Sequence, residues 1–253
     1  MMKAIVELKN ATKVVTNGFD EERVILDNVN LTIYQGDFIT ILGGNGAGKS
    51  TLFNVIAGTL PLTSGSVHIL GEDVTNWPAE KRAKYLARVF QDPKMGTAPR
   101  MTVAENLLIA KYRGEGRGLV PRRLAQQTEE FAQLLPRVGN GLEKHLDTPA
   151  GLLSGGQRQA LSLLMASLKQ PELLLLDEHT AALDPKTSQS LMQLTDELIE
   201  TKGMTALMVT HQMEDALRHG NRLIVMKNGQ IIQDQTAEEK SKMKLEDYYK
   251  LFD

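Results

Sequence analysis

Hydrophobic and polar positions follow two different periods along this chain. Residues 3–9 and 29–34 alternate apolar and polar side chains, which predicts strands with one face toward solvent. Residues 38–42 and 173–177 are instead nearly continuous apolar runs, which are typical of strands buried on both faces. A helical period over roughly 186–201 follows the second run. Buried strands that alternate with helices predict a largely parallel sheet covered on both sides.

Turn residues and short apolar runs add further elements to this sheet. Residues 64–74 and 222–234 are predicted hairpins, the second with an Asn-Gly turn. Residues 87–91 and 205–210 are predicted to be further strands, and residues 238–252 an amphipathic terminal helix. We expect this terminal helix to dock on the protein rather than to anchor it in a membrane.

Strand signals fade in the middle of the chain, where helical spacing takes over. We therefore predict a single α/β domain over residues 1–253, built on a mostly parallel sheet with an antiparallel β portion. Residues of about 1–98 and 171–253 are expected to form its core. Residues of about 99–170 are expected to form an inserted helical subdomain.

Composition and charge exclude several classes of protein. The chain has 253 residues, of which 42% are hydrophobic and 24% charged, and its formal net charge is -2. A chain without a dense basic field is not expected to bind nucleic acid. There are no cysteines, so a disulfide framework is excluded. No apolar run of about 18 residues occurs and the start does not resemble a signal peptide, so we expect membrane contact only through a partner.

A glycine-rich stretch between a predicted strand and a predicted helix carries the first candidate chemistry. "GGNGAGKS" matches G-x-x-x-x-G-K-[ST] in full, and its flanking elements are those that a phosphate-binding loop requires. The backbone amides and the helix N-terminus form an anion site, Lys49 reaches the β- and γ-phosphates, and the Ser50 hydroxyl can ligate Mg²⁺. The predicted nucleotide-binding residues of this loop are Gly43, Gly44, Asn45, Gly46, Ala47, Gly48, Lys49, Ser50 and Thr51, the last expected at the α-phosphate.

Two carboxylates follow the leucine run at 173–176. In open parallel sheets the ligand site lies beyond the carboxyl ends of the strands, so Asp177 and Glu178 are expected in the same cleft as the phosphate loop. Asp177 is then a predicted Mg²⁺ ligand, and Glu178 is placed to orient or deprotonate the attacking water. The predicted positive partner of these acids is Mg²⁺ together with Lys49.

The segment "LLSGGQRQAL" at 152–161 resembles the signature of ABC-type ATPases, a family of P-loop NTPases. The resemblance covers essentially the whole chain, and the motifs follow the family's order. It implies two ATP molecules in a head-to-tail homodimer, each held between the phosphate loop of one copy and the signature of the other. The N-terminus of the signature helix would supply a second anion site. Signature residues implied to bind nucleotide are Ser154, Gly155, Gly156 and Gln157.

The same resemblance assigns roles to three isolated polar residues. Gln91 in "FQDP" corresponds to a glutamine that acts in catalysis and at the metal, and Asp184 in "AALD" to an aspartate near the nucleotide. His211 in "VTHQM" corresponds to a histidine that bonds the γ-phosphate. The implied catalytic set is Glu178, His211, Gln91 and Lys49, and the implied metal set is Ser50, Gln91 and Asp177.

Two positions depart from the family's usual pattern. Val15 stands where an aromatic residue usually stacks on adenine, and Phe19 is either a substitute platform or a plain loop aromatic. His179 follows the two acids where proline is common, and alternation at the strand end should turn its side chain away from Glu178.

The whole pattern predicts the ATP-hydrolysing subunit of an ABC transporter, most simply an importer. The chain would sit in the cytoplasm, at the inner face of the membrane, on permease subunits that contact the surface near Gln91 and residues 94–107. "DEHTAALDP" resembles a bacterial subgroup that works with a substrate-binding lipoprotein, with aromatic amino acids suggested as cargo. The alternative is an ABC-type ATPase without a permease, such as an iron–sulfur assembly component. The arginine-rich stretch 112–124 is expected to be a solvated loop.

Overall fold

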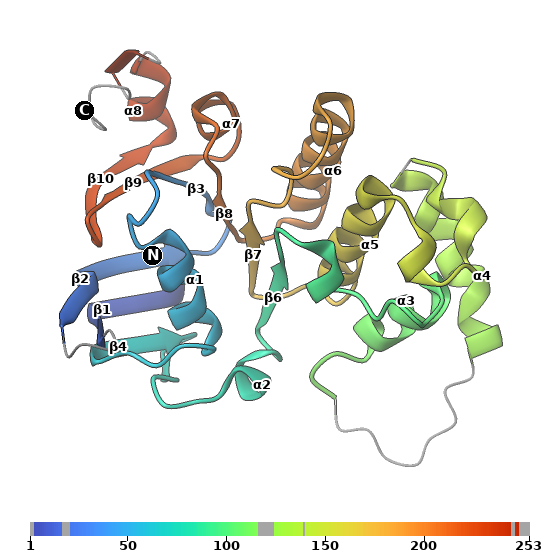
Figure 1. The fold of residues 1–253 in the computed structure, drawn as a ribbon, viewed down its shortest axis with the longest axis horizontal. Helices are drawn as coiled ribbons and strands as arrows, with labels where there is room; N and C mark the ends of the chain where they lie inside the picture. The colour runs from blue at the N-terminus through green and yellow to red at the C-terminus, as the bar shows by residue number, and fades with distance from the viewer. Residues whose placement is uncertain (1–2, 17–20, 116–123, 139, 244–245, 248–253) are drawn as a thin grey trace.

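The computed structural model describes residues 3–16, 21–115, 124–138, 140–243 and 246–247. Within them lie two sheets of different kinds, a six-stranded mostly parallel sheet and a four-stranded antiparallel sheet. Figure 1 shows the antiparallel sheet at one end of the molecule and helices α3 to α5 at the other, with the parallel strands between them. This is the predicted α/β fold with its antiparallel portion and its helical region.

The six-stranded sheet has the order β10-β9-β3-β8-β7-β6. Its strands are β3 (Phe38–Gly43), β6 (Leu86–Val89), β7 (Leu173–Asp177), β8 (Ala206–Val209), β9 (Arg222–Lys227) and β10 (Gln230–Thr236). All neighbours are parallel except the β9–β10 hairpin. The leucine run of β7 alternates between two cores: Leu173 and Leu175 join one apolar cluster, while Leu174 and Leu176 join the other. The continuous run is therefore explained by burial on both faces.

The four-stranded sheet has the order β2-β1-β4-β5. Its strands are β1 (Ala4–Thr16), β2 (Glu22–Tyr34), β4 (Ser64–Ile69) and β5 (Glu72–Asp73). The first two strands are longer than the sequence predicted, because register shifts along the β1–β2 pair interrupt the alternation of apolar and polar positions. Residues 22–24 at the start of β2 are also exposed, at the edge of the sheet.

Helices cover both faces of the parallel sheet. The helices are α1 (Lys49–Ala57), α2 (Ala79–Arg82), α3 (Val103–Lys111), α4 (Leu124–Leu134), α5 (Gly155–Leu168), α6 (Pro185–Lys202), α7 (Met213–Arg218) and α8 (Ala237–Lys242), with short 3₁₀ turns η1 (Pro93–Met95), η2 (Leu135–Arg137), η3 (Leu142–His145) and η4 (Ala150–Leu152). Helix α1 shares one apolar cluster with both sheets, whereas α3 to α6 share the other cluster with β6, β7 and β8. This packing holds the phosphate-loop helix rigidly between the sheets.

The helical region shares its core with the parallel sheet, and its predicted boundaries near residues 98 and 170 stay a prediction. The expectation of a solvated loop at 112–124 holds for Tyr112, Gly114 and Glu115, which are exposed, but not for Arg113. Arg113 does not lie in solvent: its guanidinium donates to the carbonyls of Ala166 at 3.2 Å and Lys169 at 2.6 Å, at the end of α5. Burial lowers the pKa of Arg113. The other arginines of the stretch (117, 122 and 123) lie outside the described residues.

The end of the chain is described as far as α8 and residues 246–247. Lys240 of α8 is buried and donates to the carbonyls of His219 and Gly220, where burial lowers its pKa to about 8. The remaining part of the predicted terminal helix lies outside the described residues. In the described part of the chain, no helix combines the length and the apolar character that a membrane span requires.

Candidate active site

The phosphate loop connects the end of β3 to the first turn of α1. Gly48, the residue before α1, has a φ of 101°, a backbone conformation that glycine adopts without strain. A Cβ added there would lie 2.8 Å from the carbonyl oxygen of Ile25, so a side chain is excluded by space as well. The amides of the first turn of α1 have no carbonyl partner within the helix, and they face an incoming anion.

Lys49 is folded back over the loop that carries it. Its Nζ donates to the carbonyls of Gly43 at 2.6 Å and Gly44 at 3.0 Å, and the residue is 5% exposed. Burial lowers the pKa of Lys49, and the nearby carboxylates of Glu178 and Asp177 oppose that shift. The ammonium is therefore held at the centre of the loop, where a phosphate would compete with the two carbonyls for its protons.

Asp177 ends β7 and has a cationic partner that the sequence interpretation missed. Its Oδ2 accepts from Nη2 of Arg88 on β6 at 2.5 Å, and both side chains are 14% exposed. The adjacent pairing of β6 and β7 brings the two residues together. The expectation that Lys49 and Mg²⁺ are the positive partners of this carboxylate was incomplete, because Arg88 forms an ion pair with one of its oxygens.

Glu178 and His211 form the second side-chain pair of the site. Glu178 Oε1 lies 2.5 Å from His211 Nε2, with the glutamate side chain 10% exposed and the histidine side chain 45% exposed. Glu178 has a φ of 47°, unusual for a residue with a side chain, and its amide donates to the carbonyl of Val209 at 3.1 Å. This strained turn at the end of β7 directs the carboxylate toward His211, two residues beyond the end of β8.

A pocket of about 380 Å³ joins the loop to this pair. Residues that line it are Arg23, Ile25, Asn45, Gly46, Ala47, Gly48, Lys49, Ser50, Thr51, Glu178 and His211. The structure thus brings Glu178 and His211 together with residues 45–51 of the predicted loop, whereas Gly43, Gly44 and Asp177 are not part of this lining. The lining also contains Arg23 of β2, which the sequence analysis did not select because nothing in the pattern places β2 beside the loop.

Other predicted site residues lie outside this lining. Gln91 is exposed two residues beyond β6, and Val15 is 39% exposed on β1, where it pairs with Arg23. Phe19 lies outside the described residues. The roles of Gln91 at the metal and of Val15 or Phe19 at the base remain predictions.

The signature segment faces a different pocket. Ser154 caps α5: its Oγ accepts from the Gln157 amide at 3.2 Å, and its own amide donates to Gln157 Oε1 at 3.1 Å. Gly155 and Gly156 occupy the first two helical positions, whose amides have no partner within the helix. This second pocket, of about 400 Å³, is lined by Ser154, Gly155, Gly156, Gln157, Asn140, Ala182, Leu183, Asp184 and Thr187.

Asp184 lies beside the signature rather than beside its own phosphate loop. It caps α6, with Oδ1 accepting from the Thr187 amide at 3.1 Å, and hydrogen bonds from Thr187 lower its pKa. Glu178 and the phosphate loop line the first pocket, the signature lines the second, and the two linings have no residue in common. Within one chain the two anion sites are therefore separate.

His179 points into the core, as strand alternation predicted, and not toward the phosphate loop. The residue is 2% exposed, and its Nε2 lies 3.0 Å from Thr195 Oγ1. The Thr195 hydroxyl donates to the Leu191 carbonyl at 2.8 Å, so His179 Nε2 carries the proton of their shared bond. Burial lowers the pKa of His179 to about 4, with a smaller contribution from His219.

The sequence profile described as ABC transporter matches residues 26–181. A tyrosine transport ATP-binding protein of Clostridioides difficile is 42% identical over 98% of this chain and 99% of its own length. The spermidine/putrescine import ATP-binding protein PotA of Haemophilus ducreyi is 38% identical over 94% of this chain, which spans 59% of that relative's length.

Solved structures agree with these relatives. The dimeric structure of MJ0796, a bacterial ABC transporter cassette, superimposes with a TM-score of 0.77 at 30% identity, over 92% of this chain and 99% of that one. A post-hydrolysis dimer of the same cassette bound to ADP and Pi gives a TM-score of 0.73 at 33% identity, again over 92% and 99%.

Proposed function

This chain belongs to the ABC transporter family as an ATP-hydrolysing cassette of the importer type, and we propose that it drives a separate permease by closing as a head-to-tail homodimer around ATP. One observation carries the proposal. Glu178 and His211 complete the phosphate-loop pocket, while the signature lines a pocket of its own. Each pocket has half of the groups that a γ-phosphate needs on its two sides, so a second copy supplies the missing half.

Three side chains divide the chemistry in this proposal. Glu178 Oε1 accepts a proton from the attacking water, which is directed in line at the γ-phosphorus as the bond to the leaving ADP oxygen breaks. His211 Nε2 lies 2.5 Å from that oxygen and orients the carboxylate. Lys49 transfers its hydrogen bonds from the loop carbonyls to the phosphate oxygens.

The donor set beside the loop fits Mg²⁺. Ser50 offers an exposed hydroxyl at the start of α1, and Asp177 keeps one carboxylate oxygen that Arg88 does not occupy. These are hard oxygen ligands, as Mg²⁺ prefers, and a site with few protein ligands takes the remainder from nucleotide and water. Among the described residues there is no cluster of three or more histidines, cysteines or acids that could hold a metal ion. When bound, the ion would neutralise charge on the phosphates.

Replacement of Glu178 tests the proposed base. Glu178→Gln should bind ATP and form a stable dimer, while turnover falls by about 10²–10⁴-fold because the proton acceptor is lost. Glu172→Gln makes the same charge change just before the opposite end of β7 and should keep wild-type turnover. Light scattering in the presence of ATP measures dimer formation, and an assay of phosphate release measures turnover. Normal turnover in Glu178→Gln would remove Glu178 from this role.

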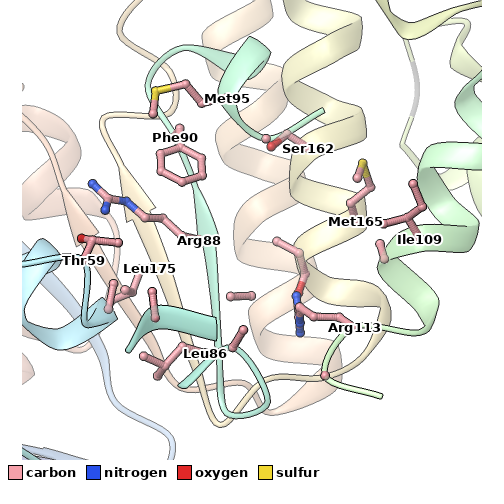
Figure 2. A pocket seen from close by; sticks show the side chains of 18 residues that line it. Thr59, Leu86, Arg88, Phe90, Met95, Ile109, Arg113, Ser162, Met165 and Leu175 are labelled. Carbon is pink, nitrogen blue, oxygen red and sulfur yellow. The ribbon is translucent and has the colours of Figure 1, made fainter. Parts of the chain in front are cut away.

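A pocket on the surface between the sheet and the helical region fits the permease contact. The pocket has a volume of about 480 Å³ and a largely apolar lining. Figure 2 shows Phe90, Met95, Ile109 and Met165 among the side chains that line it. Met95, four residues after Gln91, is 69% exposed and lies within the predicted contact region 94–107. An apolar segment of a permease would bury this side chain.

Recovery of partners from detergent-solubilised membranes tests that contact. The wild type should recover a polytopic protein, and Met95→Asp should recover much less of it, because burial of a carboxylate opposes docking. Ile232→Asp, at an exposed apolar position on β10, is the matched control and should recover as much as the wild type. Exclusively soluble partners would contradict a transport function and favour the iron–sulfur alternative.

The proposed cargo is an amino acid of the aromatic class, delivered by a substrate-binding protein to a permease whose inner face carries this chain. The support is the tyrosine transport relative, which is similar over nearly the whole length of both chains. Loss of this chain should reduce uptake of labelled tyrosine by its cells, and only a copy with intact Glu178 should restore it. Unchanged tyrosine uptake together with reduced polyamine uptake would move the cargo to the PotA class.

A further inference from the structure

Arg88 is a cation in the middle of a buried strand, and it ties three elements together at the catalytic edge. Its Nη2 donates to Asp177 Oδ2 at 2.5 Å on β7, and its Nη1 donates to Asn54 Oδ1 at 2.7 Å on α1. The phosphate-loop helix, the strand that ends in the metal carboxylate, and the strand that leads to Gln91 therefore share one guanidinium.

The guanidinium is held for these two contacts. Its Cζ lies 4.8 Å from the Phe90 ring centroid and 5.9 Å from that of Phe53. Within the described structure the Nε of Arg88 is buried and has no hydrogen-bond partner. The guanidinium is therefore oriented so that Nη1 and Nη2 bond Asn54 and Asp177, while the Nε donor stays unsatisfied. Figure 2 shows the head group directed away from helix α5, which carries Ser162 and Met165.

A fixed positive charge at one oxygen of Asp177 has two consequences for a divalent cation. It leaves the other oxygen in one orientation, and it repels any cation that approaches this oxygen. We propose that Arg88 is a positioning residue that orients Asp177 and weakens the metal affinity of the nucleotide-free site, so that Mg²⁺ arrives with the nucleotide phosphates and not before them. The inference rests on the Mg²⁺ site proposed above.

Binding of Mn²⁺, an EPR-visible substitute for Mg²⁺, tests this inference. We would titrate Mn²⁺ into the full-length protein, both without nucleotide and with ADP. Arg88→Met should tighten Mn²⁺ binding at least about tenfold, the effect of removing one charge a few ångströms from a divalent ion. Arg222→Met is the matched control: Arg222 is also ion-paired, with Asp37 and Asp234, and its side chain is 17% exposed. It should leave Mn²⁺ affinity unchanged.

A charge-preserving substitution separates orientation from repulsion. Arg88→Lys keeps the charge but cannot contact Asn54 and Asp177 together, so Mn²⁺ affinity should stay within about threefold of the wild type while turnover falls. If Arg88→Met fails to fold, as judged by circular dichroism, Arg88→Gln removes the charge with a polar side chain and is judged by the same tenfold criterion.

Two outcomes distinguish this inference from the proposed function. Unchanged Mn²⁺ affinity in folded Arg88→Met, with weakened affinity in Asp177→Asn, would overturn the role of Arg88 and keep the metal site. Unchanged Mn²⁺ affinity in Asp177→Asn would overturn the metal site itself. Tighter binding in Arg88→Met alone, with no change in Arg222→Met, supports the proposal.

Discussion

Acidification should destabilise this cassette through His179, which is folded into the core as a neutral imidazole. Its Nε2–H is engaged by Thr195 Oγ1, so a second proton must be taken up at Nδ1 inside the protein. Burial is the main cause that lowers its pKa to about 4, and the neighbouring His219 adds to it, while Asp196 opposes it. In the unfolded chain the same imidazole has a pKa of about 6.5.

The size of the effect follows from these two pKa values. Because the folded pKa is the lower one, the unfolded chain binds more protons between pH 4 and 6.5, and stability falls as the pH decreases through that window. Each pKa unit corresponds to about 1.4 kcal/mol, so the wild type should lose about 2 kcal/mol by pH 5 and about 3 kcal/mol below pH 4 from this group.

Urea unfolding at about pH 7.5, 6.5, 5.5 and 5.0 measures the effect against two variants; these pH values run from above the window into its middle, where about 2 kcal/mol should be lost. His179→Leu removes the titrating group, so its stability should depend less steeply on pH, after a loss of about 1 kcal/mol at neutral pH from the missing hydrogen bond. Thr195→Val removes the same hydrogen bond but keeps the buried imidazole, so it should retain the wild-type slope. Parallel pH profiles for the wild type and His179→Leu would refute the reasoning.

Three further substitutions test other parts of the structure. Lys49→Ala should weaken ATP binding by about 10–100-fold, measured by fluorescent-nucleotide titration, because the loop loses its charged donor; unchanged affinity would contradict the phosphate assignment. Arg82, 2% exposed, donates to five backbone carbonyls that include the end of α1. Arg82→Met should therefore lower the free energy of unfolding by about 3–5 kcal/mol in urea, and a loss below 1 kcal/mol would disagree. Val15→Tyr should tighten ATP binding up to about tenfold by stacking, with no gain expected if adenine lies elsewhere.

The chemistry of the phosphate loop and of the acidic strand end was predictable because both depend on local sequence. A glycine-rich turn between a buried strand and a helix has few other uses, and the leucine run before Asp177 requires burial on both faces. His179 was also placed correctly by strand alternation. The phosphate loop needs only a local motif, and the other two predictions need only the period of the strand.

Contacts across the sheet could not be predicted in the same way. The pairing of Arg88 with Asp177 depends on β6 lying next to β7, and no periodicity reveals that order. A cation inside the apolar run at 86–90 was a signal that a buried acid lies nearby, but it does not identify which acid. Likewise the full lengths of β1 and β2 could not be predicted, because bulges interrupt the alternation of apolar and polar residues.

Mixing two inactive variants tests most directly whether the catalytic site is divided between two chains. Lys49→Ala disables the phosphate loop, and Gly155→Asp places a negative charge in the signature. A Cβ added at Gly155 would lie 3.9 Å from Leu183 Cδ2, an ordinary van der Waals contact, so the side chain fits without strain. Each variant alone should be inactive, while a mixed dimer contains one intact site, so an equimolar mixture should recover about a quarter of wild-type ATP hydrolysis if chains pair at random. No recovery in a mixture that still dimerises, or full activity of Gly155→Asp alone, would contradict a site shared between two copies.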